Sequence, residues 1–190
     1  MNILMKILAI LWDFFESVVV ALVIFLFCYI FLFQPHKVQG YSMYPTLDDG
    51  QYLLTDKLSY RFRDPSLGDI IVFNAPDNPK YDYIKRIIAG PGDRVKLIDG
   101  HFYINGYILD ESEYLAEDVI TIGEYFLREG GETIVPFDYY FVAGDNRMHS
   151  SDSRQFGPIA KDKIVGRAWF GYWPVDKIGL INHADINISQ

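Results

Sequence analysis

Residues 94–106, RVKLIDGHFYING, decide the fold class of this 190-residue chain. Two short runs rich in Val, Leu, Ile, Phe and Tyr, residues 94–98 and 101–104, stand on either side of Asp99-Gly100. Asn105-Gly106 ends the second run. Asp-Gly and Asn-Gly suit two-residue hairpin turns, so this stretch predicts an antiparallel β-meander.

The same rhythm continues on both sides of this meander. Residues 69–73 and 139–142 are further runs of apolar and aromatic side chains, and turn-forming residues separate such runs at intervals of roughly eight to twelve residues. Only residues 110–118 suggest a soluble helix. The sequence therefore predicts a mainly β protein, with an antiparallel sheet or barrel-like domain at residues 36–190 behind a membrane helix at residues 1–35.

The membrane helix is predicted from residues 18–33, VVVALVIFLFCYIFLF, which contain no charged side chain. About twenty apolar residues span a bilayer core as a helix. A cleavable signal peptide has small residues before its cut, and residues 31–35 offer no small pair, so we favour a retained anchor over a signal peptide or a buried core helix. Lys6 on one side and His36 and Lys37 on the other leave its orientation nearly undecided by charge.

Composition excludes several classes of function. The net charge of −8 argues against a nucleic-acid partner. Cys28 is the only cysteine and lies inside the apolar run, so no intrachain disulfide and no multi-thiolate metal site can form. The four histidines lack ligand spacing. We expect no metal and no cofactor.

Lys85 is a candidate base, because residues 81–88, YDYIKRII, read as a strand that carries cations among apolar neighbours. Alternation would place Tyr83, Lys85 and Ile87 on one face, and Arg86 on the other. Burial disfavours a charged ammonium and lowers its pKa, which makes a lysine usable as a base. Taken by itself, the strand favours another interpretation, a solvated edge strand with both cations pointing outward.

Ser42 is a candidate nucleophile in residues 40–47, GYSMYPTL. A serine in such a turn commonly hydrogen-bonds the local backbone only. It becomes a nucleophile when a neighbouring base takes its proton, and Ser-Lys pairs are one accepted arrangement. The two candidates therefore depend on each other.

A third polar segment, residues 144–157, GDNRMHSSDSRQFG, directly follows an apolar strand. Loops placed by a rigid scaffold are where functional sites concentrate. A purely structural alternative is that Asp145, Arg147, Asp152 and Arg154 pair among themselves.

In their order and spacing these segments resemble the type I signal peptidases, the membrane-bound Ser-Lys endopeptidases that remove signal peptides from exported proteins. The motifs that carry the resemblance are residues 42–47 (SMYPTL), 68–73 (GDIIVF), 83–86 (YIKR), 90–93 (GPGD) and 144–147 (GDNR), followed by Ser150, residues 152–154 and Gly157. Together they cover most of residues 36–170. The short chain with one anchor is similar to the Gram-positive-type members.

The resemblance implies a role for each matching residue. Ser42 corresponds to the nucleophile and Lys85 to the general base. Ser150 matches the serine that orients the lysine amine, and Asp152 with Arg154 matches a supporting ion pair.

The resemblance also implies an oxyanion hole made of the Ser42 amide and a second donor at position 40. Because that residue is Gly40, only its backbone can donate. Met148 and His149 stand where other members often have acidic or amide side chains, and we assign His149 no catalytic role.

The implied substrates are preproteins with small side chains at −1 and −3, such as Ala-x-Ala. Shallow pockets near Val38, Met43, Tyr83 and Ile84 are expected to accept these groups, although each of the four residues could instead be core. The implied location is a single-pass cell-membrane protein near the export channel, with a cytoplasmic N-terminus and residues 36–190 on the extracytoplasmic side.

Two other classes of protein compete with this interpretation. A membrane-anchored, non-catalytic β-domain that binds a partner protein would share the anchor and strands. A self-cleaving repressor-type peptidase would carry a DNA-reading helical module at its N-terminus, where this chain is lipid-compatible. Residues 169–174, WFGYWP, suit either the membrane interface or the core.

Overall fold

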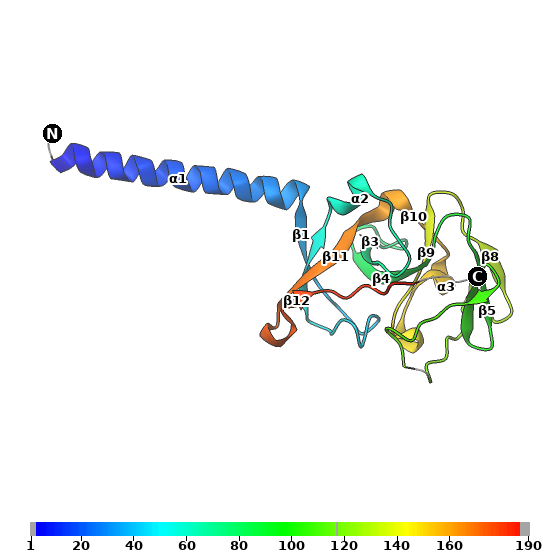
Figure 1. The fold of residues 1–190 in the computed structure, drawn as a ribbon. Coiled ribbons are helices and arrows are strands. Elements are labelled where there is room, and N and C mark those ends of the chain that lie inside the picture. The colour runs from blue at the N-terminus through cyan, green and yellow to red at the C-terminus, as the bar shows by residue number, and fades with distance from the viewer. Residues whose placement is uncertain (1–2, 117, 187–190) are drawn as a thin grey trace.

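The computed structural model describes residues 3–116 and 118–186, and its most visible feature is helix α1 (Ile3–Phe31), which projects from a β-rich body (Figure 1). The stretch Met5–Phe31 is long and apolar enough to cross a membrane. The helix begins well before the apolar run at 18–33. It ends at Phe31, earlier than the predicted boundary at residue 35, because the next residues join the sheet.

All strands of the larger sheet pair antiparallel. Its order is β1 (Phe33–Lys37), β2 (Tyr52–Asp56), β11 (Ile164–Trp173), β3 (Ile70–Asn74), β4 (Asp82–Ala89), β9 (Tyr139–Ala143) and β10 (Ile159–Ala160), with β12 (Gly179–Leu180) beside β11. The smaller sheet has the order β7 (Tyr107–Ile108), β6 (His101–Ile104), β5 (Arg94–Ile98) and β8 (Glu132–Ile134). Short helices complete the described chain: α2 (Ser59–Phe62), α3 (Ser153–Phe156) and the 3-10 turns Arg147–His149, Lys161–Lys163 and Val175–Lys177.

The predicted meander is confirmed as β5, β6 and β7. Asp99 (φ 51°) and Gly100 (φ 77°) form its first turn, and Asn105 (φ 55°) and Gly106 (φ 92°) its second. Both central residues of each turn have positive φ, as a type I′ hairpin turn requires. The mainly β fold class and the strands predicted at 69–73 and 139–142 are confirmed as well, within one residue at either end.

The helix predicted at residues 110–118 is wrong. The described residues of this range form turns instead, with residue 117 outside the description. The Asp110 carboxylate accepts hydrogen bonds from both the amide (3.1 Å) and the hydroxyl (2.6 Å) of Ser112. Such local side-chain bonds compete with the helical pattern, and Asp commonly makes them.

The core fills both faces of the larger sheet and the space below the smaller one. One cluster contains Ile71, Phe73, Ile87 and Val142, a second contains Met43, Leu53, Ile70 and Val72, and a third contains Val95, Leu97, Phe102 and Phe141. The rings of Phe102 and Phe141 meet edge to face at 6.1 Å between centroids. This contact packs β6 of the small sheet against β9 of the large one, which fixes the loop that follows β9.

Helix α1 is joined to the sheet through only one residue, Leu32. The Lys57 amide donates to the Leu32 carbonyl (2.9 Å), and the Lys57 ammonium donates to the Ile30 carbonyl (3.1 Å). The ring of Phe33, the first residue of β1, stacks on Trp169 at 4.9 Å. Helix and sheet are therefore clamped together, and Trp169 belongs to this clamp.

Candidate active site

Strand β4 carries Lys85 and Arg86 into the interior of the domain. It lies between β3 and β9, so the solvated edge strand that the sequence allowed is wrong. Lys85 is 4% exposed and Arg86 is 1% exposed. Two buried cations on adjacent residues need specific partners, because an unpaired buried charge is expensive.

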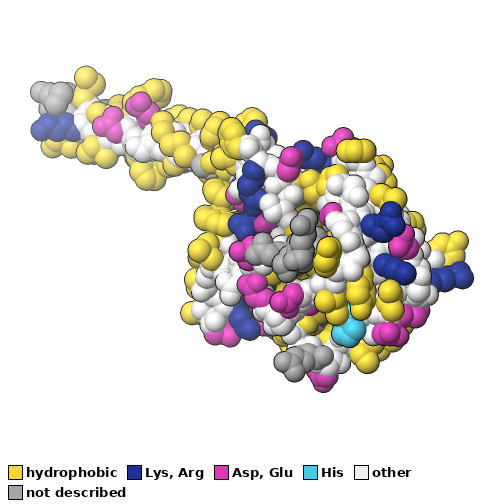
Figure 2. Space-filling view, turned by 45° about the vertical axis from the view of Figure 1, so that its right-hand side comes forward, with side chains coloured by type: hydrophobic (Ala, Val, Ile, Leu, Met, Phe, Trp, Pro, Cys, Tyr) yellow, Lys and Arg dark blue, Asp and Glu magenta, His cyan; other side chains and the backbone are white. Residues whose placement is uncertain are grey.

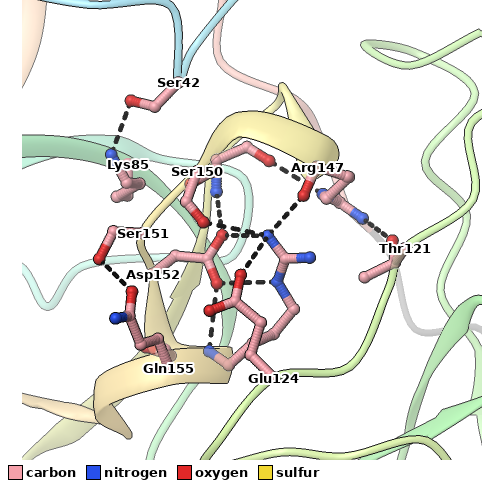
Figure 3. Close-up of polar contacts among 12 residues, drawn as sticks. Ser42, Lys85, Thr121, Glu124, Arg147, Ser150, Ser151, Asp152 and Gln155 are labelled. Atoms are coloured by element: carbon pink, nitrogen blue, oxygen red, sulfur yellow. Dashed lines mark hydrogen bonds and ion pairs between the residues drawn. The ribbon is translucent and has the colours of Figure 1, made fainter.

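The partner of Lys85 is Ser42, which lies in the turn between β1 and β2. Lys85 Nζ is 2.7 Å from Ser42 Oγ and 3.0 Å from the Ile84 carbonyl oxygen (Figure 3). Burial lowers the pKa of Lys85 to about 8, although the charges of Asp152 and Asp145 oppose this shift. An amine that loses its proton near neutral pH, at hydrogen-bond distance from a hydroxyl, can act as its base.

The polar loop after β9 holds the turn that bears Ser42. The Asn146 amide donates to the Ser42 carbonyl (3.0 Å), and the Thr46 hydroxyl donates to Asp145 (2.5 Å). These two contacts hold the turn that bears Ser42 against the loop after β9. Neither contact could be expected from the sequence, since Asp145 and Asn146 lie about 100 residues from Ser42 along the chain.

The predicted oxyanion donors differ in availability. The Ser42 amide makes no hydrogen bond within the described residues, so it is free to donate. The Gly40 amide instead donates to Asp49 Oδ1 at 2.8 Å. Each amide has a single hydrogen, so in this conformation Gly40 does not supply the donor that the resemblance implied.

Ser150 lies near the turn that bears Ser42, but within the described residues it makes no hydrogen bond to Lys85. Within the described residues its hydroxyl has no hydrogen-bond partner, and it is buried at 6% exposure. A Cβ at Gly144 would lie 2.2 Å from Ser150 Oγ and 2.5 Å from the Ser42 carbonyl oxygen. Gly144 therefore allows Ser150 to approach the back of the Ser42 turn.

Asp152 and Arg154 form the ion pair that the sequence suggested. Arg154 donates through Nε and a terminal nitrogen to the two Asp152 oxygens, both at 2.8 Å, and both side chains are fully buried. Asp152 also accepts the amide of Gly144 at 3.0 Å. Burial alone would raise the pKa of Asp152, but its bonds to Arg154 outweigh this and hold that pKa below its usual range.

Asp145 and Arg147 do not join that pair, which corrects the prediction that the four charges pair among themselves. Asp145 pairs with Arg86 at 2.8 Å, and Arg147 donates to Glu111 at 2.9 Å. The reason is topological, because the neighbouring strand β4 brings Arg86 beneath the loop. Arg86, next to a candidate lysine, was the sequence signal that could have suggested the first pair.

The four predicted pocket residues line one groove together with the dyad. Val38, Met43, Tyr83 and Ile84 enclose a space of about 380 Å³ along with Ser42 and Lys85. Val38 and Met43 also belong to the hydrophobic core. His149 is exposed, as expected. The described residues contain no group of three or more His, Cys, Asp or Glu side chains suited to a metal.

Comparisons with known proteins agree with this chemistry. Residues 11–173 match the family model described as "Signal peptidase, peptidase S26". The chain is 38% identical to a probable signal peptidase I-2 of Synechocystis over 171 residues, covering 87% of this chain and 75% of that protein. It is 41% identical to a signal peptidase I of Bacillus caldolyticus over 170 residues, covering 86% and 90%. A crystal structure of a signal peptidase I from Enterococcus faecalis is 31% identical, covers 55% of this chain and 97% of that chain, and has a TM-score of 0.46.

Proposed function

This chain belongs to the peptidase S26 family of signal peptidases, and on that premise we propose that Ser42 is its nucleophile and Lys85 its general base. As a member of the family it is a serine endopeptidase that removes signal peptides. The observation that carries the assignment is the 2.7 Å separation of Lys85 Nζ from Ser42 Oγ. The family gives no support to the non-catalytic β-domain.

The mechanism is acyl transfer. Neutral Lys85 takes the hydroxyl proton of Ser42 while Ser42 Oγ attacks the carbonyl carbon of the scissile peptide. The ammonium of Lys85 then gives that proton to the leaving amine, the C–N bond breaks, and an ester on Ser42 remains. Lys85 next removes a proton from water, whose oxygen attacks the ester carbonyl carbon. The bond between that carbon and Ser42 Oγ then breaks, Lys85 returns the proton to Ser42 Oγ, and the signal peptide leaves with a free carboxylate.

The free amide of Ser42 supports the developing oxyanion, and preorganised donors of this kind contribute most to acyl transfer. Gly40 contributes a second donor only if its amide leaves Asp49. We assign Ser150 the role of orienting the Lys85 amine, because its hydroxyl is buried next to the turn that bears Ser42. Asp152 and Arg154 act as positioning residues, since their pair holds the Gly144 amide behind the dyad.

The groove that contains Val38, Met43, Tyr83 and Ile84 supports a preference for small side chains before the cut. Two of these residues are packed core, so the groove cannot deepen easily to admit a larger group. We assign positions −1 and −3 of the preprotein to this groove, with the substrate extended as an added strand along residues 82–85 of β4, because β9 pairs only with the later part of β4, from Arg86 onward.

We further propose that α1 is a single-pass membrane anchor with its N-terminus in the cytoplasm, and that residues 36–190 act on the extracytoplasmic side near the export channel. Outside the clamp, Trp173 is 54% exposed and Val175 is 69% exposed. Exposed tryptophan suits a membrane interface. Liposome binding by residues 33–190 tests this contact, because unchanged binding after Trp173→Ser removes the interface assignment.

The catalytic assignment is tested with a preprotein that carries an Ala-x-Ala junction. Ser42→Ala and Lys85→Ala should each lower kcat/KM by several orders of magnitude, as loss of a nucleophile or base does. Ser112→Ala and Lys96→Ala are matched controls in an exposed loop and in β5, and both should cleave normally. Near-normal cleavage by either dyad variant would defeat the mechanism.

A further inference from the structure

A second groove borders the Ser42 turn and has no role in the mechanism above. It encloses about 750 Å³, and its lining is mostly apolar. Among its lining residues are Tyr44, Pro45, Val119, Ile120, Ile122 and Met148. Ile120 and Met148 are each 60% exposed, and Ile122 is 53% exposed. Contiguous apolar side chains left in water commonly mark a binding groove.

This groove is continuous with the catalytic turn. Tyr44 and Pro45 stand two and three residues after Ser42 in the same turn, and Asn146, another lining residue, donates its amide to the Ser42 carbonyl. The groove shares no lining residue with the one that contains Val38 and Met43. The two grooves therefore meet the same turn through different residues, one through Ser42 and Met43 and the other through Tyr44 and Pro45.

An extended substrate must use both sides of that turn. The scissile carbonyl lies at Ser42 Oγ, and residues before it occupy the groove along β4. An extended chain advances about 3.3 Å per residue. The first residues after the cleaved bond therefore extend beyond Ser42 along the turn. We infer that the apolar groove binds the first residues of the mature protein, on the C-terminal side of the cleaved bond. This inference rests on the proposed function.

The chemistry of the groove defines which segments suit it. Its cation, Arg147, is 2% exposed and already paired with Glu111, so it offers an acidic segment no free positive charge. Asp118 adds a carboxylate to the lining. Met148 is flexible and polarizable, and such a side chain adapts to different apolar partners. The groove therefore favours apolar or uncharged mature segments and disfavours acidic ones.

A charge-swap experiment tests this inference. Preproteins with one signal peptide and one Ala-x-Ala junction carry a single Lys or a single Glu at mature positions +2 to +5 in turn. Met148→Glu should raise kcat/KM for the Lys substrates relative to the Glu substrates, and Met148→Lys should do the opposite. Exposed charge pairs are worth under about 1 kcal/mol, so we expect each preference to change about two- to fivefold.

Ile134 is the matched control, because it is 58% exposed and lies on β8, away from the groove. Ile134→Glu and Ile134→Lys should show no reciprocal preference. The Ile122→Glu and Ile122→Lys pair repeats the test if a Met148 variant loses thermal stability. A reciprocal change at one or more positions supports the inference. Equal changes for both substrates, or none at any position, overturn it, whereas persistent cleavage by Ser42→Ala would instead overturn the catalytic assignment.

Discussion

The rate of cleavage should depend on pH through Lys85, because only the neutral amine can take the Ser42 proton. With a pKa of about 8, about one tenth of Lys85 is neutral at pH 7. An unburied lysine with the ordinary pKa of 10.5 would be neutral in only about 3 molecules in 10,000 at that pH. Burial therefore increases the reactive fraction about 300-fold.

The sign of the effect follows from this titration. Below the pKa each pH step of one unit changes the neutral fraction about tenfold, so kcat/KM should rise nearly tenfold between pH 6 and pH 7. It should level off above about pH 8 to 9. The assay is cleavage of a detergent-solubilised preprotein under kcat/KM conditions from pH 6 to pH 9.5, with circular dichroism at each pH to show that the fold persists.

An independent reading comes from carbon-13 NMR of the lysine side chains in Ser42→Ala, which retains the buried environment of Lys85. The resonance of Lys85 is identified as the lysine signal that is missing from the spectrum of Lys85→Met. This signal should titrate near pH 8. A rate profile that is flat or falls between pH 6 and pH 8, or a Lys85 resonance that titrates near pH 10.5, would refute the argument that burial activates this amine.

Three further changes have defined outcomes. Asp152→Ala leaves the Arg154 guanidinium buried without its carboxylate, so the free energy of unfolding in urea should fall by about 3–5 kcal/mol, and a loss below about 1 kcal/mol would contradict that view. Gly144→Ala places a methyl group 2.2 Å from the Ser150 hydroxyl oxygen and should lower kcat about 100-fold. Gly90→Ala is the control, because its methyl group meets only one atom at 3.7 Å, and it should leave kcat unchanged. Lys57→Met removes the ammonium group that donates to the Ile30 carbonyl at the end of α1. Cleavage in vesicles should slow severalfold, while cleavage in detergent should be unchanged. Equal slowing in both would exclude a role of Lys57 in anchoring.

The elements that could be predicted from the sequence are those with local causes. The hairpin turns at residues 99–100 and 105–106 depend on dipeptides that tolerate positive φ, and the strands beside them alternate visibly. Residues 110–118 contain helix-favouring side chains, yet Asp110 bonds locally to Ser112 and Glu111 is drawn to Arg147. Propensity was overridden there by contacts that composition does not encode.

The candidate site divides in the same way. The approach of Ser42 to Lys85 followed from motif order, and the structure places the two groups within hydrogen-bond distance. The partners of Arg86 and Arg147 could not be predicted, since Asp145 and Glu111 lie 59 and 36 residues away along the chain. The contact of the Gly40 amide could not be predicted either, since a carboxylate nine residues later accepts its only hydrogen.

The clamp between α1 and β1 couples the orientation of the helix to that of the sheet. A 29-residue helix is about 44 Å long, whereas the hydrocarbon layer of a bilayer is about 30 Å thick. A helix longer than the hydrocarbon layer tilts, and the tilt changes with bilayer thickness. Only Leu32 separates this helix from the sheet, so, with α1 in the proposed role of membrane anchor, we expect a change in its tilt to change the orientation of the groove beside Ser42 relative to the membrane plane.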